Sequence, residues 1–322
     1  MSLERPPTYG DTTGEYLAAR RGAGLVEGSH DLVWVEGQDA ISFLDGQLSQ
    51  EIVAMEPGEV ARSFLLEPRG KLRALLWVLR GADRVGLVAD RGLGPVVVEQ
   101  LTRFRFRVEA AIELDERPVA MLWGAGSPAV LAAAGLPAPA GWSEAEGAVV
   151  ASVAVGVARF AVAGVNADRL VESGARRVGA LAETSVRIEA GEPVMGIDVD
   201  DSSIPQETGL VPQSVSFTKG CYLGQELVAR IDSRGHVNRM LRGIVIRDTV
   251  IPPVGAELLS GDAVVGTVSS VGESLSLRAP VALGMVRREA EPGADVQVRW
   301  PGGSARGEVR ALPLDDFSGD SE

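Results

Sequence analysis

The chain has 322 residues, of which 45% are hydrophobic, and it carries a formal net charge of −13. This length predicts two or three domains, and the negative charge argues against direct nucleic-acid binding. The single cysteine excludes an internal disulfide, which favours a reducing compartment. No apolar run is long enough to cross a membrane, and the first residues do not resemble a signal peptide, so we predict a cytoplasmic protein with no membrane association.

The first third of the chain predicts a mixed unit of helices and strands. Strand-like and helix-like periodicities alternate, and a Glu-Pro-Arg-Gly turn separates two apolar strand segments, as in a hairpin. The order hairpin, strand, helix, strand favours an α+β fold over a doubly wound one. The expected elements are a strand over residues 24–36, a helix over 38–48, a hairpin over 62–66 and 71–78, a strand over 85–89, a helix over 95–104 and an alternating strand over 103–108.

Residues 119–129 imitate a dinucleotide-binding fingerprint, because an apolar strand-like run is followed by Gly-Ala-Gly. The helix after it can extend only to about Ala134, where a Gly-Leu-Pro sequence stops it. A dinucleotide site needs a full crossover helix and a strand that ends in an acid. Glu144, at the offset expected for that acid, lies in a segment rich in proline and glycine. We therefore expect no nucleotide site here, and a loop or linker over residues 137–147.

The second half of the chain ends in a region of different character. From residue 242 onward, short alternating segments separated by turn residues predict a small antiparallel β-barrel or sandwich. Before it, residues 149–162 favour strands and residues 167–174 a helix. Residues 198–216 are polar and irregular, and a solvated loop is a better interpretation of their acids than a metal site. The acidic tail, residues 315–322, is expected to be disordered.

The segment Lys219-Gly220-Cys221-Tyr222-Leu223-Gly224-Gln225-Glu226 holds the only cysteine and one of only two lysines. A helix is expected to begin near Gly224, which would put Cys221 just ahead of a helix N-terminus and two residues from Lys219. Both features favour a thiolate. The alternative is a buried structural cysteine, which is the more common role of a lone thiol.

Basic residues gather around this segment. Five basic and two acidic residues occur between Lys219 and Arg242, in a chain of net negative charge. Such arginines bind carboxylates or phosphates, although a solvated surface explains them equally well. The two histidines, His30 and His236, have no partner at metal-ligand spacing, so we predict neither a zinc site nor a catalytic triad.

The cysteine segment resembles the YgfZ family of folate-binding proteins, which is implicated in assembly or repair of iron–sulfur enzymes. That family is related to the glycine-cleavage T-protein, an aminomethyltransferase. The resemblance covers most of the chain: further matching segments are Ile204-Pro205-Gln206-Glu207, the segment from Val228 to Gly235, Phe43-Leu44-Asp45-Gly46-Gln47-Leu48-Ser49, Leu65-Leu66-Glu67-Pro68-Arg69-Gly70-Lys71 and the C-terminal barrel.

The resemblance implies an α+β cloverleaf of two subdomains and a C-terminal antiparallel β-barrel around a central opening for tetrahydrofolate or a derivative. The folate-binding region would span residues 1–241, with subdomains over 1–50 plus 140–241 and over 51–139. The barrel would span 242–314. The residues implied for function are Cys221 with Lys219, Gln225 and Glu226, and those implied for folate are Glu207 and Arg230, with Trp34, Phe43 and Leu48 as an apolar wall or as core.

Two departures from the related enzymes affect the expected activity. The resemblance implies paired catalytic aspartates where this chain has Ala74-Leu75, and Thr-Asn-Asp where it has Ser49-Gln50-Glu51. We therefore expect a folate-dependent accessory protein for iron–sulfur client proteins, with enzymatic turnover an open question. The alternatives are a folate-dependent aminomethyltransferase that uses another carboxylate, and a non-catalytic interaction protein. Because a cluster normally takes four ligands, one thiol would need ligands from a partner.

Overall fold

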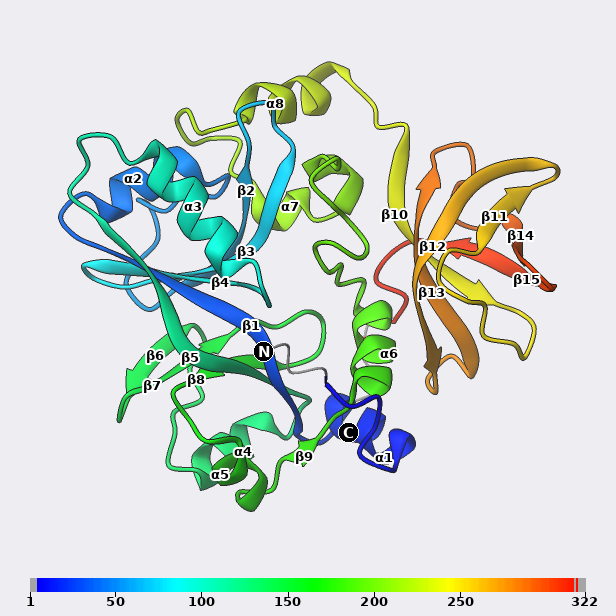
Figure 1. Cartoon of the computed structure of the whole chain (residues 1–322), viewed down its shortest axis with the longest axis horizontal. Helices are drawn as coiled ribbons and strands as arrows, with labels where there is room; N and C mark the ends of the chain where they lie inside the picture. The colour runs from blue at the N-terminus through cyan, green and yellow to red at the C-terminus, as the bar shows by residue number, and fades with distance from the viewer. Residues whose placement is uncertain (1–4, 316, 318–322) are drawn as a thin grey trace.

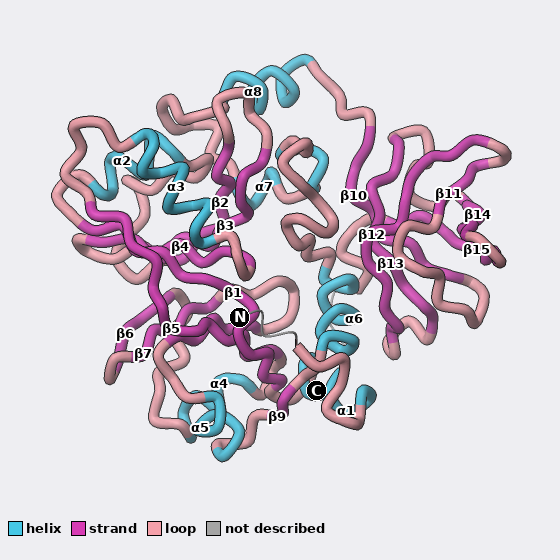
Figure 2. The backbone as a smooth tube through the Cα atoms, in the orientation of Figure 1, coloured by secondary structure: helices cyan, strands magenta, loops and turns pink. Residues whose placement is uncertain are grey.

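The computed structural model describes residues 5–315 and residue 317. Figure 1 shows three lobes around a common centre, two of which share a long sheet on the left while a β-barrel forms the third on the right. Strands dominate all three lobes, and the helices lie at their edges and between them, as the tube in Figure 2 shows. The predicted α+β architecture with a C-terminal barrel is confirmed.

One nine-stranded sheet extends through both lobes on the left. Its strands are β1 (Gly24–Glu36), β2 (Val60–Leu66), β3 (Leu72–Arg80), β4 (Arg84–Asp90), β5 (Ala111–Trp123), β6 (Trp142–Ala145), β7 (Ala148–Ser152), β8 (Arg159–Ala163) and β9 (Arg176–Arg177). The order is β2-β3-β4-β1-β5-β8-β7-β6, and β9 pairs with β1. The predicted hairpin is therefore the β2–β3 pair. Because β1 and β5 pass through both lobes, the subdomain boundaries expected from the sequence remain a proposal.

A β-bulge interrupts the pairing of β1 with β5 between Val26 and His30. Gly28 lies inside this bulge with φ +56°, a left-handed conformation that glycine adopts without steric cost. Beyond the bulge β1 pairs with β4, and His30 lies directly opposite Asp90. The pairing of β1 with β4 therefore brings these two polar residues together, just beyond the bulge.

The helices are short, and local capping explains several of their ends. The longer ones are α1 (Thr12–Arg20), α2 (Ala40–Gln47), α3 (Gly94–Phe104), α6 (Ala180–Ala190) and α8 (Gln225–Arg234), and the shorter ones are α4 (Ser127–Ala133), α5 (Ala167–Glu172), the 3₁₀ helix η1 (Pro205–Thr208) and α7 (Val211–Ser214). The Asp11 carboxylate caps α1 by accepting the N–H of Gly14, and Gly191 ends α6 in a left-handed conformation. Helix α4 has seven residues, too few for a dinucleotide crossover helix, as predicted.

The C-terminal region forms a closed six-stranded barrel with the order β10-β13-β12-β11-β14-β15. Its strands are β10 (Arg239–Ile246), β11 (Glu257–Ser260), β12 (Ala263–Ser274), β13 (Ala279–Arg287), β14 (Asp295–Trp300) and β15 (Gly303–Arg310). Closure pairs every strand on both sides, so no edge is left for aggregation. Helix α6 packs against β12 and β13 and joins the barrel to the sheet lobes.

Three local predictions were wrong. The arginine–phenylalanine alternation at residues 103–108 is the end of α3 and a loop, because Phe106 projects into solvent instead of packing on a sheet. The expected loop at 137–147 contains strand β6, in which Trp142 stacks 5.8 Å from Trp34. The segment 198–216 includes the helices η1 and α7 within its irregular backbone. In each case tertiary packing decides the outcome.

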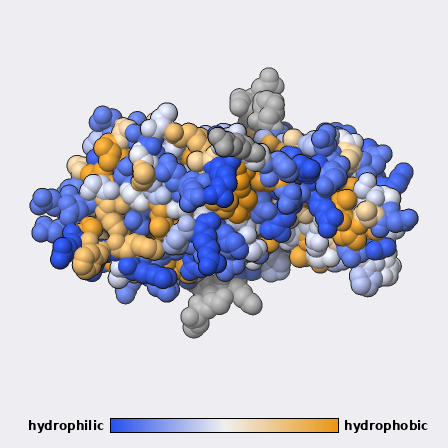
Figure 3. Space-filling view, turned by 90° about the horizontal axis from the view of Figure 1, so that it is seen from above, coloured by the Kyte–Doolittle hydropathy of each residue, from blue (hydrophilic) through white to orange (hydrophobic). Residues whose placement is uncertain are grey.

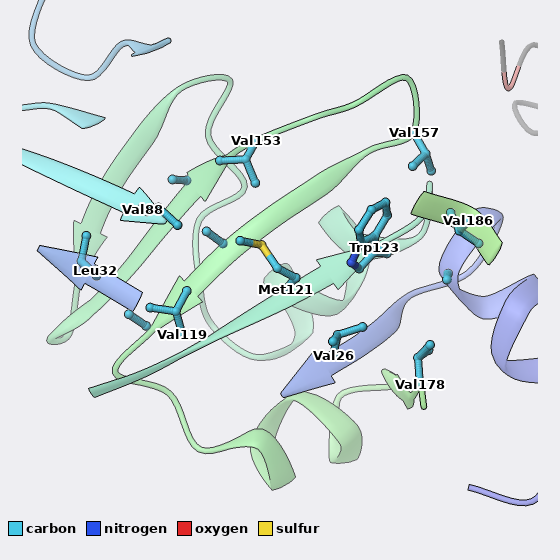
Figure 4. Close-up of a cluster of buried hydrophobic side chains, with 14 of the residues drawn as sticks. Val26, Leu32, Val88, Val119, Met121, Trp123, Val153, Val157, Val178 and Val186 are labelled. Atoms are coloured by element: carbon cyan, nitrogen blue, oxygen red, sulfur yellow. The ribbon is translucent and has the colours of Figure 1, made fainter. Parts of the chain in front are cut away.

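One buried cluster lies where β1 and β5 meet the helices α1 and α6. Figure 4 shows Met121 and Trp123 of β5 pointing into it, with Val26 of β1 and Val186 of α6 nearby. All four side chains are at most 2% exposed. This cluster joins the N-terminal helix, the sheet and the helix that carries the barrel.

The chain returns to this cluster after leaving the barrel. The Leu314 N–H donates to the Glu189 carbonyl (2.8 Å), Asp315 pairs with Arg20 (2.9 Å) and Phe317 is buried among the residues of the cluster. Asp315 and Phe317 therefore differ from the disordered tail expected over residues 315–322. The rest of that tail, residue 316 and residues 318–322, lies outside the described residues.

The surface is largely hydrophilic on the face seen in Figure 3, with apolar residues in scattered patches. Within residues 5–315 and at residue 317, no helix is both long enough and apolar enough to span a membrane.

Candidate functional site

The cysteine segment forms a loop between α7 and α8 that packs on the β2–β3 turn. Gly224 has φ +81°, and a Cβ there would lie 2.8 Å from the Glu67 carbonyl oxygen. Gly70 has φ +80°, and its Cβ would lie 2.7 Å from the Cβ of Leu227. Two segments that the sequence singled out separately, the turn and the cysteine loop, therefore fit closely because both have glycine at the contact.

Lys219 fixes this loop from the inside. Its side chain is 1% exposed, and its ammonium donates to the carbonyl oxygens of Asp45 (2.5 Å), Leu48 (3.0 Å) and Gln50 (2.8 Å). Burial lowers the pKa of Lys219, partly offset by the carboxylate of Asp45 at 3.4 Å. The ammonium thus joins the cysteine loop to the segment after α2, and no contact within the described residues joins it to the thiol.

Cys221 is an exposed free thiol at the surface of this loop. A buried structural cysteine, the alternative that the sequence left open, is therefore excluded. Helix α8 begins at Gln225, four positions after the cysteine, and the Gln225 amide donates to the Gly220 carbonyl at 3.4 Å. The loop therefore presents the thiol to solvent from a backbone that is anchored at Lys219 and Gly224.

The structure places Glu226 and Arg230 on the outer face of α8. Their side chains are 84% and 67% exposed, and they pair with each other at 2.5 Å in an i, i+4 arrangement. Within the described residues, no contact joins Arg230 to Glu207. The structure thus places the two residues that the resemblance implies for folate on different elements, Glu207 on η1 and Arg230 on α8, and their roles in folate binding stay a prediction.

Glu207 has a different arginine partner. It lies on η1, is 8% exposed, and accepts the N–H of Ile204 at 3.1 Å. Arg239, at the start of β10, donates to both carboxylate oxygens, from Nε at 2.8 Å and from a terminal nitrogen at 3.3 Å. This bond raises the pKa of Arg239. The pair joins the barrel to η1, and no sequence pattern indicated it beyond the cluster of basic residues between Lys219 and Arg242.

Trp34, Phe43 and Leu48, proposed as an apolar wall, belong to the core instead. Leu48 is fully buried among the side chains between α2, α3 and the sheet, and Phe43 packs in the same cluster. The Trp34 indole N–H donates to Asp115 at 3.0 Å, on the part of the sheet where Trp142 packs. These side chains do not line the central pocket described next.

A central pocket, most of whose lining residues the sequence did not single out, lies between the sheet and residues 192–214. Its free volume is about 20 Å³, enough for a water molecule. Charged and aromatic side chains from distant segments line it together with apolar ones. The lining residues are His30, Arg62, Ser63, Phe64, Leu75, Leu76, Trp77, Val88, Ala89, Asp90, Glu192, Pro193, Leu210 and Ser214.

Glu192 is held between two arginines in this pocket. Arg62 contacts one of its oxygens, and Arg159, itself 2% exposed, donates to the other at 3.1 Å. Burial alone would raise the pKa of Glu192, but the two guanidinium groups outweigh it and lower that pKa to about 2. The Arg62 guanidinium also lies 4.6 Å from the centre of the Trp77 ring. With two guanidinium groups and one carboxylate, this triplet has a net positive charge beside the pocket.

Asp90 and His30 form the second polar group. The His30 Nε2 lies 3.6 Å from Asp90 Oδ1, and Asp90 Oδ2 accepts the N–H of Met195 at 2.9 Å. Burial raises the pKa of Asp90 to about 6, and burial together with Arg159 lowers the pKa of His30 to about 3. At neutral pH the pocket therefore combines an ionised carboxylate with a neutral imidazole.

One of the two residues that replace the paired aspartates implied by the resemblance, Ala74 and Leu75, lies in this pocket. Leu75 lines the pocket, whereas Ala74 faces the opposite side of the sheet and packs in the core with α2 and α3. At a position where the resemblance implies an aspartate, the pocket therefore has an isobutyl group. Within the described part of the chain, no group of three or more His, Cys, Asp or Glu side chains could hold a metal ion.

Comparison with known proteins fits this geometry. Residues 239–316 match the glycine cleavage T-protein C-terminal barrel domain. The chain is 28% identical to an aminomethyltransferase from Streptomyces avermitilis over 97% of this chain and 91% of that one, and 26% identical to the tRNA-modifying protein YgfZ of Pectobacterium carotovorum over 70% and 71%. The crystal structure of the glycine cleavage system aminomethyltransferase T from Bartonella henselae superposes with a TM-score of 0.89 at 27% identity, over 97% of this chain and 92% of that one. The predicted resemblance is confirmed: the chain is similar to aminomethyltransferases in sequence and fold, and to YgfZ proteins in sequence.

Proposed function

We propose that this protein binds tetrahydrofolate or a derivative and supports the assembly or repair of iron–sulfur enzymes in the cytoplasm, using Cys221. The observation that carries the proposal is the exposed thiol on an anchored loop. Cys221 faces solvent, while the backbone on either side is fixed by Lys219 and Gly224. A thiol presented in this way is accessible to a partner protein, which a structural cysteine would not be.

The side chains around the centre suit a reduced pterin. A carboxylate accepts the paired N–H donors of a pterin ring. Glu207 is a buried carboxylate on η1, and Asp90 is a half-buried carboxylate that lines the central pocket. Trp77 adds an aromatic surface. Because the free volume is about 20 Å³, a bound ring would have to displace side chains such as Arg62 from the pocket.

Leu75 favours an accessory role over aminomethyl transfer. An isobutyl group cannot polarise an amine or carry a proton, so the pocket lacks the carboxylate that the resemblance implies at this position. A transferase would need another carboxylate to act in its place.

The single cysteine also limits how a cluster could be bound. One thiol provides one of the four ligands that a cluster normally takes, so the remaining ligands would come from a client protein or a small thiol. Direct binding to nucleic acid is not part of the proposal, because the chain has a net charge of −13.

Calorimetric titration with tetrahydrofolate under anaerobic conditions tests the folate half of the proposal. We expect saturable binding by the wild type and by Cys221→Ser, and at least about tenfold weaker binding by Glu207→Gln, which loses a charged hydrogen-bonding partner. Arg230→Ala removes the exposed guanidinium that the resemblance implies for folate and should also weaken binding, and equal binding by this variant would refute that role. Absence of binding by the wild type would exclude the folate assignment.

Complementation tests the thiol half. In a strain that lacks this protein, the activity of iron–sulfur enzymes should be restored by the wild-type chain and not by Cys221→Ser, at equal protein levels. Full restoration by Cys221→Ser would leave the thiol without a role and favour the non-catalytic interaction protein. Turnover of a secondary amine with tetrahydrofolate would instead favour the aminomethyltransferase.

A further inference from the structure

The chain between α3 and β5, on the left in Figure 1, presents an apolar ring to solvent. Among the described residues, Phe106 is the most exposed large apolar side chain, at 78%. An exposed ring forgoes the hydrophobic stabilisation that burial would give it. Single exposed apolar residues are common on proteins, so the surroundings of this ring decide what it means.

Three arginines without acidic partners surround the ring. Arg103, Arg105 and Arg107 are all exposed, and within the described residues none of them forms an ion pair with a carboxylate. Residues 103–109, which we call the Arg–Phe segment, contain one acid, Glu109, and therefore carry a net charge of +2. The whole chain carries −13, so this segment is a positive site on a negative molecule.

Contacts within the segment hold the ring at its tip. The Arg105 guanidinium donates to the Ala110 carbonyl at 2.8 Å, and the Phe106 N–H donates to the Phe104 carbonyl at 3.0 Å. Arg107 has φ +55°, a conformation that few residues other than glycine adopt, and its guanidinium lies 5.2 Å from the centre of the Phe106 ring. A ring and a cation that are ordered before binding lose less entropy when a partner covers them.

The residue types and the charge indicate the chemistry of that partner. Aromatic residues and arginine dominate the binding energy of protein interfaces, and guanidinium groups bind carboxylates through paired hydrogen bonds. An extended anionic surface, such as a bilayer or a nucleic acid, would also meet the repulsion of the rest of this negative chain. A short acidic segment is affected only by charges within about 10 Å, the screening length at 0.1 M salt. At that range the arginines determine the potential.

We propose that the Arg–Phe segment is a docking surface for an acidic segment of a partner protein. Phe106 packs between apolar side chains of the partner, and Arg103 and Arg107 bind its carboxylates. The segment lies on a different element from the cysteine loop and does not line the central pocket. The inference therefore goes beyond the proposed function and does not rest on it.

Fluorescence anisotropy with a labelled peptide tests the proposal. The probe has a central pair of leucines flanked on each side by three glutamates; one control peptide has lysines in place of the glutamates, and a second has glutamates only. We expect the wild type to bind the probe saturably with a Kd below about 1 mM at about 20 mM salt. Binding should weaken at least about fivefold at about 200 mM salt, be weaker for the glutamate-only peptide and be absent for the lysine peptide.

Two variants remove the ring and the charges separately. Phe106→Ala and the double variant Arg103→Gln/Arg107→Gln should each bind the probe at least about fivefold more weakly. Arg105 stays unchanged, because its guanidinium holds the loop to the Ala110 carbonyl. All three substituted side chains are exposed, and circular dichroism should show the same thermal unfolding as in the wild type.

Matched controls place the substitutions elsewhere on the surface. Arg287→Gln/Arg288→Gln removes two exposed arginines of the barrel and changes the net charge equally, and Phe217→Ala removes a ring that is 47% exposed in the cysteine loop. Both should bind the probe like the wild type. Losses as large as those of the Arg–Phe variants would overturn the proposal, as would the absence of saturable binding by the wild type.

Two further measurements address other occupants of this surface. Sedimentation with phosphatidylglycerol vesicles detects a membrane, and analytical ultracentrifugation of the protein alone detects a second copy. We expect neither vesicle binding nor self-association that depends on Phe106. Vesicle binding that Phe106→Ala abolishes, without binding of the peptide, would overturn the proposal in favour of a membrane. Self-association that Phe106→Ala abolishes would overturn it in favour of a second copy.

Discussion

Replacing Lys219 by methionine tests whether its buried ammonium anchors the cysteine loop. Methionine keeps most of the unbranched stem but removes the donor to the carbonyls of Asp45, Leu48 and Gln50. A hydrogen bond to a charged group contributes about 1.5–3 kcal/mol, and a buried carbonyl left without a donor costs about 1–3 kcal/mol. Of the three carbonyls, the Leu48 contact is buried and the other two are partly accessible to water.

The expected loss for Lys219→Met is about 2–4 kcal/mol of unfolding free energy, since water can replace the donor at the two accessible carbonyls and the cost of burying a charge is relieved. With a urea m-value of about 3 kcal/mol/M for a chain of this size, the midpoint of unfolding should fall by about 1 M. Far-UV circular dichroism at increasing urea concentration measures this midpoint.

Lys71→Met is the matched control, because it changes the chain's only other lysine. Lys71 is half-buried in the β2–β3 turn, where its backbone carbonyl accepts the Glu67 N–H at 2.9 Å, a bond that the substitution leaves intact. Its midpoint should change by less than about 0.2 M. Equal shifts for the two variants, or a shift below about 0.2 M for Lys219→Met, would refute the anchoring role.

Three further predictions concern the same region and the pocket. Gly224→Ala should lower the unfolding free energy measured in urea by about 1–3 kcal/mol, because φ is +81° and the new Cβ would lie 2.8 Å from the Glu67 carbonyl oxygen. Gly220→Ala is the control and should be nearly neutral, because its Cβ would have no atom within 4 Å. A larger loss for Gly220→Ala than for Gly224→Ala would contradict the described loop. Cys221→Ser should change the unfolding free energy by less than about 0.5 kcal/mol, because the thiol is exposed, and a larger loss would indicate a buried role. Asp90→Asn should stabilise the protein at pH 7.5 by up to about 3 kcal/mol. The Asp90 pKa rises on folding from 3.8 to about 6, so its ionisation destabilises the folded state as pH increases through this window. The gain in unfolding free energy from Asp90→Asn should shrink toward pH 4. A gain that does not depend on pH would refute the raised pKa of Asp90 as its cause.

Local sequence patterns predicted the helices and strands well where an element packs against segments that are close to it in the sequence. The strand at 24–36 and the β2–β3 hairpin were predicted from alternation and turn residues. The same patterns predicted an antiparallel barrel or sandwich after residue 242, and the resemblance favoured the barrel that is found. The wrong predictions concern segments whose sequence fits both a strand packed in a sheet and a loop exposed to solvent. Arginine–phenylalanine alternation fits a strand, yet Phe106 is 78% exposed because no strand lies beside it.

Some residues of the candidate site could be predicted from the sequence, and others could be found only in the structure. Lys219 and Cys221 were singled out by their rarity and their place in one motif, although rarity could not tell that one is buried and the other exposed. Arg239 was one of several nearby arginines, and only the position of β10 against η1 pairs it with Glu207. His30, Asp90 and Glu192 come from three distant segments, and each looks unremarkable alone. Their meeting depends on the pairing of β1 with β4 and on the segment after α6.

The return of the chain from the barrel to the first core affects how the protein can fold during synthesis. The cluster around Val26 and Trp123 receives Phe317, and Arg20 receives Asp315, from a segment that the ribosome makes after the whole barrel. Domains generally fold in order as they emerge. Here the nascent N-terminal lobes can form their sheet early, but this core stays open on one side until the barrel has been made. The apolar face around Trp123 is therefore exposed to chaperones for most of translation.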